Sequence, residues 1–351
     1  DIDGSLSVIA AGQAVNLGGT GNDLTGNVTL TGGAVTLVDT TATAIAGITA
    51  TGALSVTSGG AITQSGAIDA DSTSSFTAGA NAITLTQVAN DFTGAVSLSN
   101  SGTNDVSLTD ANALDLGTVG VGQDLTITAT GGALTDSGNV TVAGLATIVS
   151  TGQSVTLGDS TTANFGSLDF AGAAVTITEG SAMAIAASEA TGSLALVASG
   201  AITQSGALDA DSTSSFTAGG NAITLTQAAN DFTGAVSLSN SGTNNVGVTD
   251  ANALDLGTVG VGQNLAVIAS GAITDSGVST IGGTSTFDNS GGSNAAIDLG
   301  SASTYTGDVT FTTDAGSDVT INDSTAFVIQ SGLNVNNLNL TAGGADRRRK
   351  Y

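Results

Sequence analysis

Short alternations of apolar and polar residues run along the whole chain. In Val96–Ser99, Val106–Thr109 and Val175–Thr178, an apolar residue is followed by a hydroxyl residue twice over. Because side chains of a β-strand point alternately to its two faces, this period of two predicts strands with one buried and one wet face. Gly, Asn, Asp and Ser separate the runs and are turn residues. No convincing helical spacing is present, so the pattern predicts an all-β chain.

The strands belong to a long sequence unit that recurs about five times along the chain. Related segments such as LSVTSGGAITQSG begin at Leu54, Leu125, Leu194 and Leu265, at steps of 71, 69 and 71 in the numbering. Residues 61–130 return at 201–270 with 59 of 70 positions identical, which indicates a recent internal duplication. A strand that begins with Val and is followed by an acid four residues later also recurs, at Val35 and Asp39, Val106 and Asp110, Val175 and Glu179, Val246 and Asp250, and Val319 and Asp323.

The spacing of the strands within a unit favours a β-helix, or β-solenoid. Strands are predicted to begin near Ile83, Val96, Val106, Leu114, Leu125, Leu134 and Val140. Three short strands with their turns take roughly 24 residues, so one unit corresponds to about three coils. The alternative is a string of β-sandwich domains, one for each unit. Sandwiches of that size usually have a core Trp or Tyr and some loop Pro, whereas this chain has two Tyr, no Trp and no Pro.

We expect one continuous repeat solenoid over residues 1–343 and a separate basic tail over residues 344–351. The body has large residues at matching places in successive units. Phe76 and Phe216, and likewise Phe92 and Phe232, are predicted to point inward at equivalent positions.

Composition and charge exclude several classes of function. The chain has 29 acidic and four basic residues, and the four basic ones are Arg347, Arg348, Arg349 and Lys350. An acidic body repels phosphate backbones and anionic lipids, which argues against nucleic acid and membrane surfaces as partners. No apolar stretch reaches the ~18–20 residues of a membrane span. Without Cys or His, thiolate and imidazole chemistry is excluded, and we expect no enzymatic activity.

Short strands ending in GAITQSG or GALTDSG, with NDFTGAVSL between them, resemble the repeats of filamentous-haemagglutinin-like exoproteins. They are also similar to the passenger repeats of autotransporters and to giant bacterial surface adhesins. The resemblance covers roughly residues 5–343. It implies a right-handed parallel β-helix and a secreted or surface-anchored rod with a role in adhesion, a surface layer or an extracellular matrix. It brings no catalytic residues with it.

Two acidic triplets are the candidate metal ligands. Asp69 and Asp71, and their copies Asp209 and Asp211, are separated by one residue, so that both carboxylates of a pair face the same side of a strand. Carboxylate oxygens gathered in this way suit Ca²⁺. The alternative is that these acids are solvated turn residues that keep the chain soluble. No cofactor is required, and calcium is the one that the sequence suggests.

We expect a non-enzymatic extracellular structural protein, located outside the cell or on a bacterial surface, that assembles into a fibre, a matrix filament or a surface layer. The partner expected first is a second copy, joined end to end into a homopolymer. Arg347 to Lys350 could grip the acidic flank of the next subunit in such a polymer. The alternative is an adhesin that binds cell-surface carbohydrate or a host surface through a lateral face.

Overall fold

The computed structural model describes residues 1–292, 294–314, 316–326, 328–329, 333 and 335–344, and every regular element in them is a β-strand. The basic tail Arg347 to Lys350 lies outside the described residues. In the part that the structure describes, no helix is long and apolar enough to cross a membrane. The chain divides into two compact units, residues 1–178 and residues 179–351, which are described separately below.

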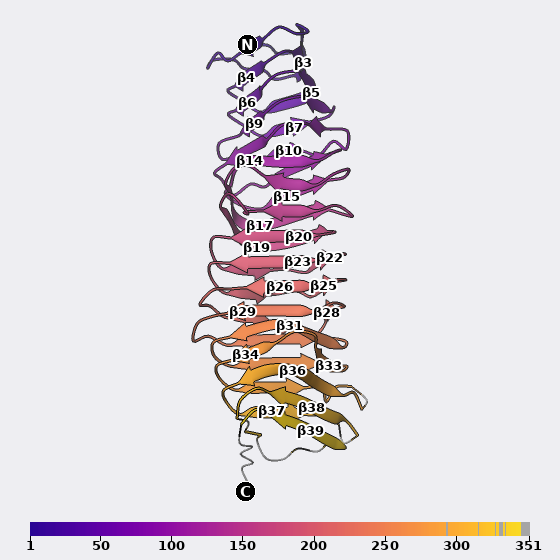
Figure 1. Cartoon of the computed structure of the whole chain (residues 1–351). Coiled ribbons are helices and arrows are strands. Elements are labelled where there is room, and N and C mark those ends of the chain that lie inside the picture. The colour runs from indigo at the N-terminus through magenta and orange to yellow at the C-terminus, as the bar shows by residue number, and fades with distance from the viewer. Residues whose placement is uncertain (293, 315, 327, 330–332, 334, 345–351) are drawn as a thin grey trace. The chain divides into compact units, whose positions relative to one another are not determined.

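The first unit is a β-solenoid with three faces (Figure 1). Strands pair in parallel with strands that lie on the same face in the neighbouring coils. On the second face, for example, Val35 pairs with Leu54 and Leu54 pairs with Ser74, so the numbering advances by 19 and then by 20 from one coil to the next. The predicted β-solenoid is therefore confirmed, and the tandem β-sandwich is excluded because its strands would pair within each domain.

The strands of the first unit follow the three faces in turn. The first face contains β1 (Leu6–Ile9), β3 (Asn27–Gly32), the second half of β5 (Thr43–Ala50), β8 (Ile68–Ala70), β11 (Asp91–Phe92), the first half of β14 (Leu114–Val121), β16 (Leu134–Asp136), β18 (Val155–Leu157) and β20 (Val175–Glu179). The second contains β2 (Val15–Leu17), β4 (Val35–Asp39), β6 (Leu54–Ser58), β9 (Ser74–Thr77), β12 (Val96–Asn100), the second half of β14, and the first parts of β17 (Val140–Ser150) and β19 (Ala163–Gly172). The third contains the first half of β5, β7 (Ile62–Gln64), β10 (Ile83–Leu85), β13 (Val106–Asp110), β15 (Leu125–Ala129) and the remainders of β17 and β19.

The second unit has the same three-faced organisation. One face contains β21 (Met183–Ile185), β24 (Ile202–Gln204), β27 (Ile223–Leu225), β30 (Val246–Asp250), β32 (Leu265–Ala269), β35 (Ser285–Asp288) and β37 (Val309–Thr312). The next contains β22 (Ser188–Ala190), β25 (Leu208–Ala210), β28 (Asp231–Phe232), the first half of β31 (Leu254–Val261), β33 (Ile273–Asp275), the first part of β36 (Ile297–Tyr305), β38 (Asp318–Asp323) and β39 (Asn337–Ala342). The last contains β23 (Leu194–Ala198), β26 (Ser214–Thr217), β29 (Val236–Asn240), the rest of β31, β34 (Ser279–Ile281) and the end of β36.

The core of each unit is a stack of inward-pointing Val, Leu, Ile and Phe side chains. Phe76 and Phe92 are buried and meet edge to face with ring centroids 6.0 Å apart, and Phe216 and Phe232 repeat this contact at 5.9 Å. The predicted inward positions of the four rings are confirmed. Outward positions on the same strands are mostly Ser and Thr, which explains the alternation in the sequence.

The sequence repeat and the coil do not have the same length. Val35 lies on the second face, Val106 on the third, where it pairs with Ile83, and Val175 on the first, where it pairs with Val155. From each of these valines to the next the chain crosses ten faces, which is three coils and one further face. The expectation of about three coils is thus corrected to three and a third. Equivalent residues of successive repeats lie on different faces, and the three faces accept the same sequence.

Glycines that recur in the repeat lie where two coils approach closely. A Cβ atom on Gly94 would be 2.5 Å from the carbonyl carbon of Ser72, in the coil before, and one on Gly234 would be 2.4 Å from that of Ser212. Both glycines belong to the NDFTG segment. The close stacking of two coils therefore explains why this position of the motif is a glycine.

Candidate functional site

The corners of the solenoid contain a buried hydrogen-bond network that we call the amide box. In the first unit it is built by Gln64 and Asn90, whose side-chain amides bond reciprocally at 2.8 and 2.9 Å. Asn90 is fully buried. Its Oδ1 also accepts from the backbone N–H of Ile68 at 2.9 Å, and its Nδ2 lies 3.0 Å from the carbonyl oxygen of Thr109. Asn90 therefore connects the preceding coil to the following one.

The second unit contains a copy of the amide box with nearly identical geometry. Gln204 and Asn230 bond reciprocally at 2.8 and 2.9 Å, and Asn230 Oδ1 accepts from the N–H of Leu208 at 3.0 Å. Because both copies satisfy all the polar groups of a buried asparagine, the box fixes the register of three successive coils.

A buried carboxyl group lies next to each amide box. Asp110 Oδ1 accepts from the N–H of Phe92 at 3.2 Å, and Asp250 Oδ2 accepts from the N–H of Phe232 at 3.3 Å. These are two of the recurring acids that follow a Val strand. All five of those acids are buried, namely Asp39, Asp110, Glu179, Asp250 and Asp323.

Burial is the main reason that the two carboxyl groups beside the amide boxes titrate abnormally. It raises the pKa of Asp110 and of Asp250 from 3.8 to about 6. The neighbouring acids Asp91 and Asp231 raise these pKa values further, while backbone N–H donors only partly oppose the change. These carboxyl groups therefore change protonation state between neutral and mildly acidic pH.

We expect each unit to become more stable as the pH is lowered from 7 to 5. Because the folded-state pKa of Asp110 and Asp250 lies above the unfolded value, the folded chain binds extra protons in this interval. The stabilisation is gained as the pH falls through 6, by ~1 kcal/mol for each carboxyl group at pH 5, and it levels off below the unfolded pKa. Urea unfolding at pH 7 and 5 measures the change. The variants D110N and D250N should reduce it, and D105N, at an exposed acid, should not.

The predicted calcium ligands lie on exposed acidic ladders. Asp69 is in register with Asp91 on the next coil, and Asp209 is in register with Glu189 and Asp231 on the coils before and after it. Burial and then the neighbouring carboxylates, those of Asp71 and Asp211 among them, raise the pKa values of Asp69 and Asp209. Among the described residues, no group of three or more acids is arranged to hold a metal ion.

Calcium at these ladders stays a prediction of the sequence. If Ca²⁺ binds there, adding it at low ionic strength should raise the melting temperature by a few degrees, because it screens stacked carboxylates. Differential scanning calorimetry with Ca²⁺ and with chelator measures this. The pair D209N and D211N should remove part of the effect. Equal melting temperatures with Ca²⁺ and with chelator would mean that the acids are only solvated.

Outward hydroxyl side chains form a ladder along one face of the first unit. On the third face of the first unit five successive coils place a Thr or Ser in register, at Thr63, Thr84, Ser107, Thr126 and Thr147. Thr-x-Thr pairs can be found by eye, but the register that aligns them depends on coil lengths that vary by a few residues. All aromatic side chains in the described part of the chain are buried.

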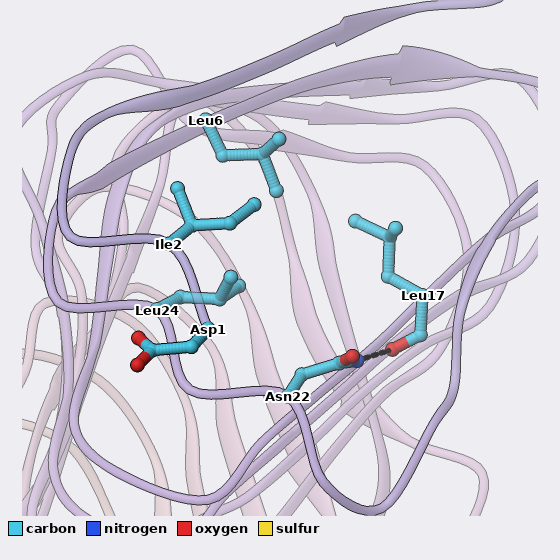
Figure 2. A pocket seen from close by; sticks show the side chains of 6 residues that line it. All are labelled: Asp1, Ile2, Leu6, Leu17, Asn22 and Leu24. Carbon is cyan, nitrogen blue, oxygen red and sulfur yellow. Dashed lines mark hydrogen bonds between the residues drawn. The ribbon is translucent and has the colours of Figure 1, made fainter.

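The first coil ends in an open apolar hollow of about 90 Å³ (Figure 2). Leu6, Leu17 and Leu24 line it together with Ile2, Asp1 and Asn22. Asn22 Nδ2 donates to the carbonyl oxygen of Leu17 at 2.7 Å and closes one side. In later coils the corresponding interior space is filled by the next layer of side chains.

Four consecutive segments match the family described as Repeats of unknown function (DUF5649), at residues 32–99, 103–169, 172–239 and 243–312. Each segment is about as long as the sequence repeat and so coincides with the unit of ten faces. No curated protein and no solved structure matches the chain.

Proposed function

The chain belongs to the DUF5649 family of repeats, and from this premise we propose that it is a non-enzymatic structural protein that forms a rigid β-solenoid rod outside the cell. The observation that carries this proposal is the parallel pairing of strands from coil to coil within each unit, which runs along three faces and is interrupted after β11 and after β28. The repeat can begin on any of the three faces, and its outward side chains are mostly small hydroxyl residues. Such a repeat suits a scaffold whose length is set by the number of repeats.

Self-association is the partnership that we propose first. The apolar hollow lined by Leu6, Leu17 and Leu24 supports this proposal, because apolar side chains of a second copy would be buried there. The three faces accept equivalent sequences, so an added coil can continue the lattice. Docking of Arg347 to Lys350 on an acidic ladder of a neighbouring copy remains part of this proposal.

An adhesin that binds carbohydrate is the second candidate. The hydroxyl ladder from Thr63 to Thr147 favours it, because it offers hydrogen-bond donors and acceptors at the spacing of the coils, about 4.8 Å. The burial of the described aromatic side chains disfavours it, because sugars commonly stack on exposed aromatic rings. Glycan-array binding with the T84A and T126A variants as controls separates this candidate from the scaffold.

Electron microscopy and cell fractionation test the scaffold proposal. Negative staining of the purified chain should show rods or filaments, and an antibody against the repeat should label intact source cells without permeabilisation. Sedimentation with and without residues 347–351 should show assembly, and a weaker assembly after tail removal if the tail docks. A strictly monomeric species in both forms would defeat the polymer, and labelling only after permeabilisation would defeat the extracellular location.

A further inference from the structure

The fourth family segment, residues 243–312, replaces the amide box by smaller and more acidic residues. Where the third segment, residues 172–239, has Gln204, Asn230 and Phe232, the fourth has Asp275, Ser303 and Tyr305. The equivalence is supported by the aromatic contact, since Phe287 and Tyr305 meet edge to face at 6.1 Å, as Phe216 and Phe232 do at 5.9 Å. The buried acid of the motif is retained as Asp323.

These replacements leave polar atoms unsatisfied in the interior of the corner. In the third segment the amide nitrogen of Asn230 donates to its neighbours, among them the carbonyl oxygen of Thr249 at 3.1 Å. Ser303 is too short to do the same. Within the described residues, the buried oxygens Ser279 Oγ, Tyr305 Oη and Asp323 Oδ2 have no hydrogen-bond partner.

The unsatisfied oxygens belong to Ser279, Tyr305 and Asp323, which are neighbouring buried residues at one corner and which, together with Ser303, we call the corner chamber. Ser303 Oγ accepts from the N–H of Ser279 at 2.9 Å, and the phenol of Tyr305 lies close to the hydroxyl groups of both serines. Ser303 and Asp323 are in register on adjacent coils. Asp323 is fully buried, and only its Oδ1 is bonded, to the N–H and hydroxyl of Thr325 at 2.9 Å.

We propose that the corner chamber binds a hard metal cation of the Ca²⁺ type, ligated by Asp323 Oδ2 and the hydroxyl oxygens of Ser279, Ser303 and Tyr305. Oxygen atoms are the ligands that such cations take, and a bound cation would stabilise the ionised form of a buried carboxyl group. Residues 1–346 contain no Lys or Arg that could do this instead.

Asp275 gives the corner chamber a connection to solvent. It lines a polar surface hollow of about 240 Å³ together with Thr274, Asp298, Gly300 and Ser301. Both of its carboxylate oxygens accept from the N–H of Ser301, at 3.2 and 3.3 Å, which holds the side chain between the hollow and the interior. A cation would enter on this side.

Terbium luminescence tests the proposal in the full chain. The sequence has no Trp, and its two Tyr are Tyr305 and Tyr351, so that the Y351F variant leaves Tyr305 as the single tyrosine. In that background, excitation of tyrosine should sensitise emission from bound Tb³⁺, and Ca²⁺ should displace it. D323N should weaken binding at least tenfold. D298N, which changes only the outer hollow, should leave the emission within twofold.

A second variant separates loss of the cation site from loss of the fold. The double substitution D275Q and S303N restores the residues of the amide box, so it should keep the fold, as judged by circular dichroism, and lose the sensitised emission. Absence of sensitised emission in the Y351F chain would overturn the proposal and leave a buried water as the occupant. Emission that survives both D323N and the double substitution would also overturn it, because the Tb³⁺ would then be bound elsewhere.

Discussion

Replacing Gly94 by alanine is expected to destabilise the first unit by about 3 kcal/mol, which is at the upper end of the cost of overpacking. The added Cβ atom would lie 2.5 Å from the carbonyl carbon of Ser72 and 2.8 Å from its oxygen. These are backbone atoms, so relief requires the two coils to separate and their parallel pairing to weaken. Gly234→Ala should have an effect of the same size in the second unit, since its Cβ meets Ser212 at 2.4 Å.

Gly120 and Gly260 provide the matched control. Each lies in a strand at an outward position where a Cβ would meet nothing within 4 Å. Alanine there should leave stability unchanged or increase it by about 0.5 kcal/mol, because alanine loses less conformational freedom on folding. Urea unfolding of the four single variants measures the differences. If Gly94→Ala and Gly120→Ala behave alike, the coils are not packed as closely as the structure has them.

The second large effect is expected at the amide box. Asn90→Ala should cost about 3 kcal/mol, because it leaves the buried N–H of Ile68 without its acceptor and removes the donor to the carbonyl oxygens of Leu85 and Thr109. Asn230→Ala removes the same contacts in the second unit. The exposed Asn104, which makes one bond to the carbonyl oxygen of Ala80 at 2.8 Å, is the control, and its alanine variant should cost less than about 1 kcal/mol.

Hydrogen exchange gives this prediction a readout that a general loss of stability would not produce. Because Asn90 connects three coils, Asn90→Ala should speed amide exchange first at Ile68 and in the coils on either side of it. Exchange that rises evenly over the whole unit would contradict a local role for the box.

The sequence was sufficient to place most strands but not to count the faces. Strands do begin at Ile83, Val96, Val106, Leu114, Leu125, Leu134 and Val140, as the alternation predicts. The pattern misses β11, which has only two residues, Asp91 and Phe92. It also reads β14 as one strand on one face, whereas Leu116 and Gly117 are both buried and mark a turn at a corner without a break in the strand. The expectation of three coils came from a coil of roughly 24 residues, whereas successive coils advance by 19 and 20 residues from Val35 to Leu54 and Ser74.

The sequence shows the residues of the buried polar sites only as residue types that recur, and it does not show that they are buried. Asn90 and Asp110 recur in the copies as Asn230 and Asp250, but Asn and Asp are also the commonest turn residues. Whether such a residue faces water or the core depends on which side of a corner it lies. That position is decided by the lengths of coils before it, and a difference of one residue reverses it.

A repeat of ten faces also has a consequence for how such chains change in length. Near-identical copies such as residues 61–130 and 201–270 are substrates for recombination, which adds or deletes whole repeats. Because ten is not a multiple of three, each repeat gained or lost moves every later residue of a solenoid round by one face, a third of a full rotation, while leaving all strand pairings available. In two chains whose lengths differ by three repeats, the later residues lie on the same faces again. Length variants of one gene would therefore display three alternative surfaces without a single substitution.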